Sequence, residues 1–512
     1  MALTKNRKLY LIGIDAAPLW IIKENYKKYK MDGFARFFDE GILTELESTL
    51  PPMTGPSWPS MYTGVRPGVH GIPDFFTLKS NYTKEVAYYD PEIIEPFWER
   101  LGKDGIRSLL ITPAMAVRLP KSENVDMMTG FPLPPRFSSE EIRRAAKKYG
   151  FEGEPNIEKM IKSKEMSLAE ASKRYVESIK KRGELAKHLM LRNNYELSFI
   201  CFTETDRIQH FSLNLPEWKS YVLPLYQEIS KFLEWTVENA EKEGARIMLV
   251  SDHGAQPIKS KFLMNAWLIN NGYARLKQEI EEQNKKTGGN SSNLKYTVRE
   301  KIIRSRLRKV YDKLPNMGKS VAKDVLGNLL VASSGEDYTR IHDFDFDMKR
   351  TVAFSSISNW TVCSIYINDS RFDEGVVSVT KKRAIKNELI RKLMLVNDEN
   401  GNKLMVRAFD ADKYYEGTQM FIAPDVMVEI KKGYFIDVFG YLKSGGLFMK
   451  PEMAKRGDHT NEGIFGAISY GDGGRKTTKH PASNPSVYQI NPTVLSYFGI
   501  PPENDRRYRK IL

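Results

Sequence analysis

The sequence has few cysteines and no long apolar run. Two cysteines, Cys201 and Cys363, are present among 512 residues, and both stand inside apolar runs, which excludes a disulfide framework and a cysteine-ligated metal site. We expect both thiols to be small buried groups. No run of about 18 apolar residues occurs, so we expect no membrane-spanning helix. The apolar stretch near the N-terminus is only about six residues long and ends at Asp15, which favours a β-strand over a signal peptide and makes the cytoplasm the expected location.

No nucleic-acid-binding motif accompanies the excess of positive charge. Lysine and arginine number 78 against 64 acidic residues, so the formal net charge is +14. This charge would attract phosphate-bearing partners, but without a recognisable motif we do not expect nucleic acid to be among them. The content of 41% hydrophobic and 28% charged residues is ordinary for a globular protein.

Short apolar runs alternate with stretches of helical periodicity over much of the chain. The runs KLYLIGIDA, RSLLITPA, ELSFICFTETD and RIMLVSDHG are separated by segments such as YVLPLYQEISKFLEWTVENAEKEG, whose apolar residues recur at helical spacing. This alternation predicts an α/β fold with a doubly wound, mostly parallel sheet. In such a sheet the functional residues lie at the carboxyl ends of the strands.

Two regions interrupt the alternation, and we interpret both as largely helical insertions that cap the active edge of the sheet. Residues 131–192 are rich in helix formers and charge, and residues 278–347 are basic and interrupted by glycine and asparagine. The expected core therefore consists of residues 1–130, 193–277 and 348–512. We interpret the basic helical pattern within 295–323 as a solvated helix face, although it could steer a polyanionic substrate or make peripheral contact with an anionic surface.

Side chains that bind metal ions stand at several expected strand ends. Asp206 and His210 are four residues apart, which would put both on one face of a helical turn. The adjacent Asp252 and His253 are weak evidence alone, because a strand-terminal aspartate often caps the following turn. The whole set indicates a metal centre, because the strand ends of such a sheet share one edge. The candidate ligands are Asp15, Asp206, His210, Asp252, His253 and His459.

The stretch PPMTGPSWPSMYTG places a hydroxyl group at an expected helix start. Thr54 follows two prolines, and the residues after it have helical character, so its side chain would stand where backbone N–H groups favour an anion. The alternative is that Thr54 or Ser57 only caps the helix. A threonine hydroxyl becomes a good nucleophile only when its pKa is lowered, which a metal ion can do.

The order of these motifs resembles that of a known superfamily. The series LIGIDAAP, LPPMTGPSWPSMYTGVRPGVHGI, ETDRIQH, VSDHGAQP, LMNAWLINNGY, IAPDVMVEI, RGDHTNEGIFGA and INPTVLSYFGIPP resembles the alkaline phosphatase superfamily. The resemblance is greatest to the branch of type I phosphodiesterases, nucleotide pyrophosphatases and related phosphohydrolases or phosphomutases. It covers the expected core, omits the two insertions, and implies an alkaline phosphatase-like fold.

The resemblance implies two metal positions beside a threonine nucleophile that passes through a phosphothreonine intermediate. The first position would be held by Asp15, Asp252 and His253 with the hydroxyl of Thr54, and the second by Asp206, His210 and His459. Nitrogen and oxygen ligands without thiolates suit zinc, with manganese or another divalent ion as the alternative. Two ions about 4 Å apart would stabilise the attacking and leaving oxygens of a phosphoryl transfer.

Other residues of the motifs have weaker implications. The nucleotide pyrophosphatases of the family generally carry an asparagine near the nucleophile, and Ser57 is the nearest candidate here for substrate binding, so nucleotide specificity stays open. The stretch TGPSW lacks the arginine of the C/S-x-P-x-R sulfatase signature, which argues against sulfatase activity. We expect His70 to fix a loop, Asp458 to orient His459 or to stand in a turn, and Asp425 to be structural.

The expected function is that of a two-metal phosphohydrolase of the phosphodiesterase or pyrophosphatase type, acting on a small anionic phosphoester. The alternatives within the superfamily are a phosphomonoesterase and a phosphomutase, in which a closed cap would exclude water and the phosphoryl group would return to the substrate. The alternative from another class is a non-catalytic protein that binds nucleic acid or acidic lipid, and the complete set of ligands argues against it. We expect no catalytic role for His188, His342 and His480, which have no ligand-like neighbours at strand ends.

Overall fold

The computed structural model divides the chain into two compact units. Unit 1 consists of Met1–Ile72, Tyr88–Pro257 and Met453–Leu512, and unit 2 consists of Pro73–Ala87 and Ile258–Glu452. The structure describes residues 7–512 except 88–89, 279–337, 341–344, 357–360, 413, 418–421, 443, 452–455, 472–473, 477–480, 482–483 and 502–509. Most of the expected basic insertion, together with His342 and His480, lies outside the described residues.

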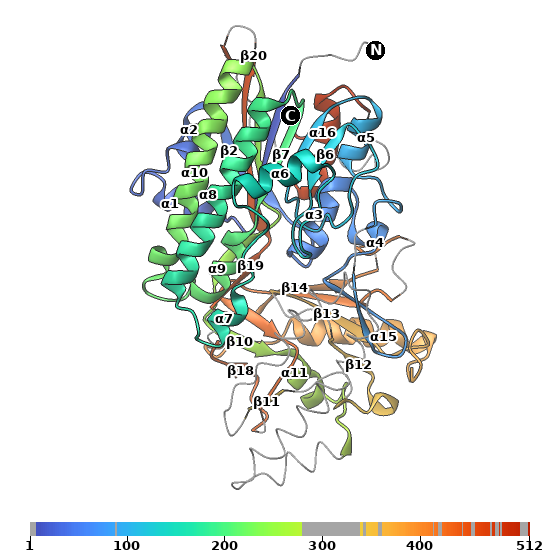
Figure 1. Ribbon diagram of the computed structural model, residues 1–512. Helices are drawn as coiled ribbons and strands as arrows, with labels where there is room; N and C mark the ends of the chain where they lie inside the picture. Colours follow the sequence, from blue (N-terminus) through green and yellow to red (C-terminus); the bar gives the residue numbers. More distant parts are fainter. Residues whose placement is uncertain are drawn as a thin grey trace. The chain divides into compact units, whose positions relative to one another are not determined.

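Unit 1 is built around an eight-stranded, mostly parallel sheet (Figure 1). The strand order is β2 (Ile42–Glu47), β20 (Glu462–Gly471), β8 (Arg246–Val250), β1 (Leu9–Ile14), β7 (Leu197–Phe202), β5 (Ser108–Ile111) and β6 (Val125–Met128), and β21 (Gly474–Lys476) pairs with β20. The run from β8 to β6 is parallel, whereas β20 is antiparallel to both β8 and β2. All residues of β1 and β7 are buried, as is typical of parallel strands covered on both faces. The predicted mostly parallel α/β fold is confirmed.

Helices cover both faces of this sheet. Ile12 and Ile200 belong to a hydrophobic cluster shared with α2 (Asp32–Glu40), α8 (Leu168–Arg192) and α10 (Trp218–Glu243). Phe199, the neighbour of Ile200 along β7, instead meets the rings of Trp58 and Tyr62 from α3 (Thr54–Thr63). The helix α16 (Ile490–Tyr497) packs against both α3 and α5 (Phe97–Lys103). Successive side chains of a strand point to opposite faces, so each strand packs against both helical layers.

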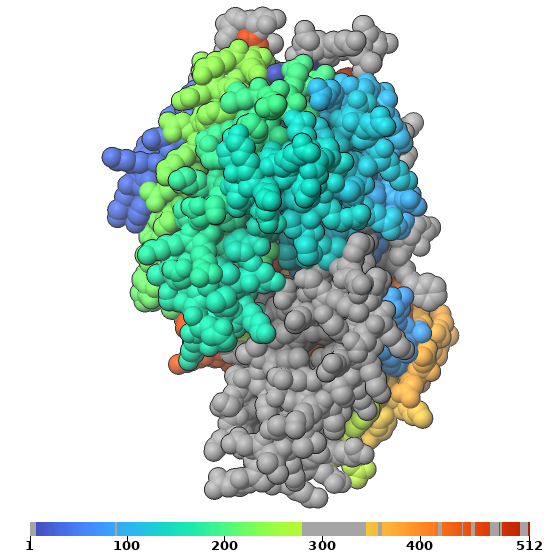
Figure 2. All heavy atoms as spheres, viewed as in Figure 1, coloured from blue at the N-terminus to red at the C-terminus, as the bar shows by residue number. Residues whose placement is uncertain are grey.

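Residues 131–192 form helices of unit 1. They are α6 (Glu140–Lys148), α7 (Glu158–Lys162) and α8. The side chains of Ser139 and Ser167 cap α6 and α8 by accepting hydrogen bonds from backbone N–H groups in the first turn. The helix α8 packs against α10, and the outer sides of α6, α8 and α10 occupy much of the teal and green surface in Figure 2.

Unit 2 has separate sheets and a separate hydrophobic cluster. Its largest sheet has the order β12 (Ala353–Phe354), β13 (Val362–Ile367), β15 (Val426–Ile430) and β14 (Met405–Asp410), and α15 (Val379–Leu393) packs against it. The strand β10 (Ser260–Leu263) lies between β16 (Tyr434–Asp437) and β18 (Phe448–Met449) and leads into α11 (Met264–Asn270). Two antiparallel pairs join β3 (Phe76–Leu78) to β4 (Lys84–Val86) and β11 (Tyr338–Arg340) to β17 (Gly440–Leu442). Asp425 is buried and accepts hydrogen bonds from the Ile367 N–H group and the Arg371 guanidinium, which is a structural role.

The compact units do not follow the boundaries expected for a core with two insertions. Residues 131–192 share the hydrophobic cluster of the central sheet, whereas Ile258–Glu452 belongs to unit 2 with its own cluster. Compact units are defined by contacts within the fold and do not test where an insertion begins or ends. The division into core, helical insertion and basic insertion stays a prediction.

Two expectations about single features can be compared with the described residues. Cys201 and Cys363 are both free and buried, as predicted. None of the helices in the described ranges is long and apolar enough to cross a membrane.

Candidate metal centre

The carboxyl ends of three neighbouring parallel strands supply most of the candidate ligands. Asp15 follows β1, Asp206 lies in the first turn of α9 (Glu204–Ser212) after β7, and Asp252 and His253 follow β8. Because β7, β1 and β8 are adjacent in the sheet, their ends meet at one edge. His459 lies on β19 (Gly457–Thr460), which pairs with β9 (Gly254–Pro257) directly after His253. This pairing brings the last ligand to the same edge from a distant part of the chain.

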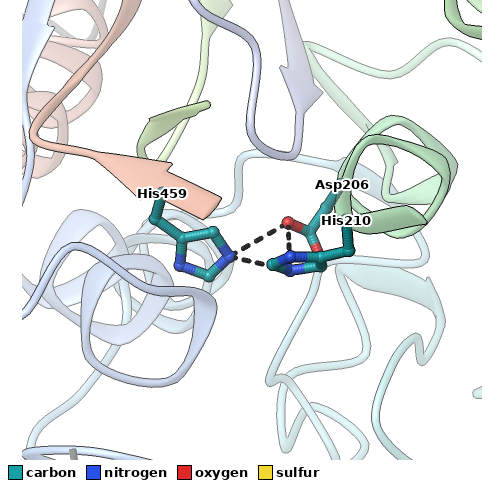
Figure 3. Close-up of side chains that lie close together, drawn as sticks. All are labelled: Asp206, His210 and His459. Carbon is teal, nitrogen blue, oxygen red and sulfur yellow. Dashed lines mark hydrogen bonds and ion pairs between the residues drawn. The ribbon is translucent and has the colours of Figure 1, made fainter. Parts of the chain in front are cut away.

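Asp206, His210 and His459 form one compact group (Figure 3). Oδ1 of Asp206 lies 3.2 Å from Nε2 of His210 and 3.1 Å from Nε2 of His459. The two Nε2 atoms are 3.1 Å apart. Ligands held about 2.0–2.1 Å from a tetrahedral zinc ion are separated by about 3.3 Å, so the group has the size of a single ion site.

A second group surrounds the hydroxyl of Thr54, which is the first residue of α3. Oγ1 of Thr54 lies 3.4 Å from Oδ1 of Asp15 and 3.5 Å from Nε2 of His253. That Nε2 atom is 3.6 Å from Oδ1 of Asp15 and 3.2 Å from Oδ2 of Asp252. The two groups are neighbours, because one ligand atom each of Asp15, Asp206 and His253 lie within 4.8 Å of one another.

Backbone carbonyl groups orient all three imidazole rings. Each Nδ1 atom donates to one carbonyl oxygen: that of His210 to Gly457 at 3.0 Å, that of His253 to Gly254 at 3.1 Å, and that of His459 to Pro52 at 2.9 Å. A carbonyl oxygen can only accept, so the hydrogen stands on Nδ1 and each Nε2 presents a lone pair. In the group of Asp206, His210 and His459, the two Nε2 lone pairs therefore face each other, a contact that becomes favourable when a cation lies between them.

The sequence carries no signal for these acceptors, because every residue has a backbone carbonyl group. For His459 the acceptor is the Pro52 carbonyl, whereas the sequence suggested Asp458. A further supporting contact comes from Trp58, whose Nε1 donates to Oδ2 of Asp15 at 3.3 Å. Trp58 stands one helical turn after Thr54, so its spacing could have indicated that it faces the same site.

Burial leaves two carboxyl groups without enough compensating positive charge. Removal from water, together with the nearby Asp252 and Asp206, raises the pKa of Asp15 well above its usual range. Removal from water, with a further contribution from Asp206, also raises the pKa of Asp252. Oδ2 of Asp252 is buried and accepts no hydrogen bond from any residue that the structure describes. A bound cation would favour the ionised form of both groups and would give this oxygen a partner.

Burial shifts the pKa of an imidazole group in the opposite direction, because it disfavours the protonated, charged form. Removal from water, assisted by His459, lowers the pKa of His253, so its ring is held in the neutral form that binds metals. The residues present therefore fit two divalent cations in donor type, tautomer and charge.

The structure brings together the seven residues assigned to the two metal positions and the nucleophile. They are Asp15, Thr54, Asp206, His210, Asp252, His253 and His459. Their roles as ligands and nucleophile stay predictions.

Ser57 lies in a buried cluster of hydroxyl groups. Its Oγ lies 2.9 Å from Oγ of Ser48 and 2.6 Å from Oγ1 of Thr49, and none of its surface is exposed. These bonds tie the first turn of α3 to the preceding loop. The predicted substrate-binding role of Ser57 gains no support from this placement and stays a prediction.

Two further histidines have structural surroundings. His70 is buried at the end of α4 (Pro67–His70), where its Nε2 pairs with Oγ of Ser60 at 2.9 Å and its Nδ1 accepts from the Ile72 N–H group at 3.2 Å. It therefore fixes a loop, as the sequence indicates. The ring of His188 packs against that of Tyr149, with 5.1 Å between the centroids.

Comparisons with known proteins agree with this geometry. The family model described as type I phosphodiesterase / nucleotide pyrophosphatase matches residues 9–354, a range that includes all the candidate ligands except His459. No curated protein sequence matches the chain.

Several solved structures are similar in fold. Phosphonoacetate hydrolase from Sinorhizobium meliloti 1021, in complexes with phosphonoformate and with phosphonoacetate, has 12% sequence identity and a TM-score of 0.53 over 96% of each chain. Murine ectonucleotide pyrophosphatase / phosphodiesterase 5 has 11% identity and a TM-score of 0.47 over 98% of this chain and 97% of that one. The similarity to the phosphonoacetate hydrolase supports the alkaline phosphatase-like fold.

Proposed function

Because the chain belongs to the family of type I phosphodiesterases and nucleotide pyrophosphatases, and is therefore a hydrolase of phosphoester bonds, we propose that it works with two divalent ions through a phosphothreonine intermediate on Thr54. The observation that carries this proposal is the position of one hydroxyl group. Oγ1 of Thr54 stands at the N-terminus of α3, 3.4 Å from Asp15 and 3.5 Å from His253.

The residues that would hold the ions are divided between the two groups. Asp15, Asp252 and His253 would hold one, and Asp206, His210 and His459 the other. We propose zinc as the physiological metal, because three imidazoles and no thiolate contribute to the set. When bound, the ions would lower the pKa of the threonine hydroxyl and offset the negative charge of the phosphoryl group.

The chain itself supplies the nucleophile, its orientation and part of the anion site. Oγ1 of Thr54 would lose its proton and attack phosphorus, and the bond from phosphorus to the leaving oxygen would break. The leaving group would depart as an alcohol after taking up a proton, and the phosphoryl group, with the second ester group of a diester still attached, would remain on Thr54. Attack by water on the phosphothreonine would then release the product and restore the hydroxyl. The first turn of α3 has N–H groups without helical acceptors and the positive end of the helix dipole, and both features favour the equatorial phosphoryl oxygens.

The substrate proposed is a small phosphodiester or phosphoanhydride. The hydroxyl cluster around Ser57 offers no asparagine-like donor to the phosphate, so a nucleotide is not singled out. The cytoplasmic location expected from the sequence remains part of the proposal.

The test is hydrolysis by the zinc-loaded protein of a bis(aryl) phosphodiester, an aryl phosphomonoester and an aryl thymidine phosphate. We expect the diester to be hydrolysed fastest and Thr54→Ala to lose at least about 1,000-fold in kcat, as removal of a catalytic nucleophile does elsewhere. Thr54→Ser should retain part of the activity, since it keeps a hydroxyl at the helix start.

The matched control is Thr63→Ala at the other end of α3, where the hydroxyl donates to the Pro59 carbonyl. This variant should keep its activity. Mass spectrometry of acid-quenched reactions should find an aryl phosphate ester on Thr54 with the diester and a phosphate with the monoester. Equal rates for wild type and Thr54→Ala would reject the nucleophile, and faster turnover of the monoester would favour a phosphomonoesterase.

A further inference from the structure

A buried array of charged side chains lies beside the candidate metal centre. It consists of Arg182 on α8, Glu154 in the segment between α6 and α7, and Glu204 and Arg207 on α9. The side chains of Arg182 and Glu204 are 0% exposed, and those of Glu154 and Arg207 are 7% and 15% exposed. Buried ion pairs often contribute no more stability than apolar side chains of the same volume. Stability alone therefore does not account for this array.

Arg182 is at the centre of the array. Its Nη2 donates to Oε1 of Glu204 at 2.7 Å and to Oε1 of Glu154 at 3.2 Å. Its Nη1 donates to the carbonyl oxygen of Cys201 on β7, and its guanidinium lies 5.3 Å from the ring centroid of Phe202. One side chain of α8 thus holds the end of β7 and the first residue of α9.

Glu154 joins the rest of the array. Its Oε2 accepts hydrogen bonds from Nη2 of Arg207 at 3.1 Å and from Oγ1 of Thr203 at 2.6 Å. Arg207 also pairs with Glu158 on α7. Residues on both sides of Asp206, namely 203–204 and 207, are therefore tied to the helical segment 131–192.

The opposite side of α9 is tied to the end of β1. Oγ1 of Thr205 donates to the carbonyl oxygen of Asp15 at 2.5 Å, and Nε2 of Gln209 donates to the carbonyl oxygen of Ala16 at 2.9 Å. These contacts fix α9 relative to Asp15, a proposed ligand of the first metal position. The array supplies a further attachment on the other side of α9, which also packs against α10 and β19.

We propose that the array of Arg182, Glu154, Glu204 and Arg207 is a positioning device for the second metal position, an inference that rests on the proposed function. By holding the first turn of α9, the array keeps Asp206 and His210 in register with His459. None of its four residues belongs to the ligand set, so the array acts through the backbone of α9. It makes metal binding at the catalytic edge depend on residues of the helical segment 131–192.

The experiment titrates zinc chloride into the metal-free full-length chain by calorimetry. We expect wild type to bind two ions. Glu154→Gln and Arg182→Met should bind the first ion with unchanged affinity and the second at least about 10-fold more weakly, as substitutions in the layer behind metal ligands do. The control Arg174→Met removes an arginine of the same helix whose ion pair with Glu170 is exposed, and it should bind both ions as wild type does.

A further variant tests whether the array only stabilises the fold. Val237→Ala removes buried volume from α10 outside the array, and it should lower the melting temperature as much as the array variants do. Glu154→Gln keeps the shape of its side chain and serves as the folded variant if Arg182→Met does not fold. The proposal is overturned if folded Glu154→Gln binds the second ion normally, or if Val237→Ala weakens it equally. A wild type that binds no zinc overturns the proposed function and this inference together.

Discussion

Hydrogen bonds to neighbouring protein groups hold the candidate ligand side chains of the metal centre in place. Each imidazole donates its Nδ1 hydrogen to a carbonyl oxygen, and Asp252 accepts at Oδ1 from the Ala16 N–H group at 3.2 Å. Trp58 donates to Asp15. The lone pairs of the ligand atoms therefore point into the centre in fixed directions, and the side chains need little rearrangement when cations bind.

The zinc affinity of the metal-free protein should fall as the pH is lowered from about 7.5 to about 5.5. Burial raises the pKa of Asp15 and Asp252, so the protonated forms persist to higher pH than in an exposed carboxyl group. The cation must displace these protons, and affinity therefore rises with pH. His253, whose pKa is lowered by burial, should release none.

Calorimetry in buffers of different ionisation enthalpy would count the protons released on zinc binding. Asp15→Asn should bind the ion more weakly and release fewer protons. Proton release that is unchanged in Asp15→Asn would contradict the assignment of the displaced protons to the buried carboxyls.

At the scale of elements, the close approach of β1 and α3 sets the distance between a ligand and the nucleophile. A Cβ atom at Gly13 would lie 2.7 Å from Cη2 of Trp58 and 3.2 Å from Sγ of Cys201. Glycine is therefore required where the strand meets the helix. Because Trp58 also bonds to Asp15, this contact joins helix packing to the geometry of the metal centre.

Gly13→Ala should lower the free energy of unfolding by about 1–3 kcal/mol, the usual effect of overpacking a buried site. It should also weaken zinc binding, because the added methyl group displaces Trp58 from Asp15. Urea unfolding and zinc titration would measure the two effects. Ile12→Val, on the opposite face of the same strand, should cost about 1 kcal/mol of stability and leave zinc affinity unchanged. Normal zinc affinity in folded Gly13→Ala would show that Trp58 does not position Asp15.

At the scale of the whole chain, net charge affects how the substrate arrives. The formal net charge of +14 creates a positive potential that attracts anions over distances of about a Debye length. The proposed substrates are anionic, so the charge would act on their association rate and not on the chemistry at Thr54.

The value of kcat/KM should therefore fall several-fold when the ionic strength is raised from about 50 to about 300 mM, while kcat stays the same. A doubly charged aryl phosphomonoester should show a steeper dependence than a singly charged diester. Steady-state kinetics with both substrates at several salt concentrations would measure this. A salt-independent kcat/KM would mean that the positive charge does not steer the substrate.

Prediction from sequence succeeded best where the information is local. Alternating apolar runs and helical segments indicated the parallel sheet, and the strand-end positions of Asp15 and Asp252 follow from the same pattern. The fold of the chain after residue 257 was harder to predict, because the short strands of unit 2 pair with strands that are far away in the sequence. The placement of Ser57 could not be anticipated either, since its partners Ser48 and Thr49 lie in a loop without periodicity.

The sequence by itself determined which side chains could take part in this chemistry, because strand periodicity and motif order assign carboxylates, imidazoles and one hydroxyl to the ends of strands. Only the tertiary structure decided that His459 joins them, through the pairing of β19 with β9, and that backbone carbonyls orient the rings. It also decided that the helical segment 131–192 holds α9 through Arg182 and Glu154. The physical reason is that contacts between distant segments depend on packing and desolvation in the folded chain, which no local pattern of residues encodes.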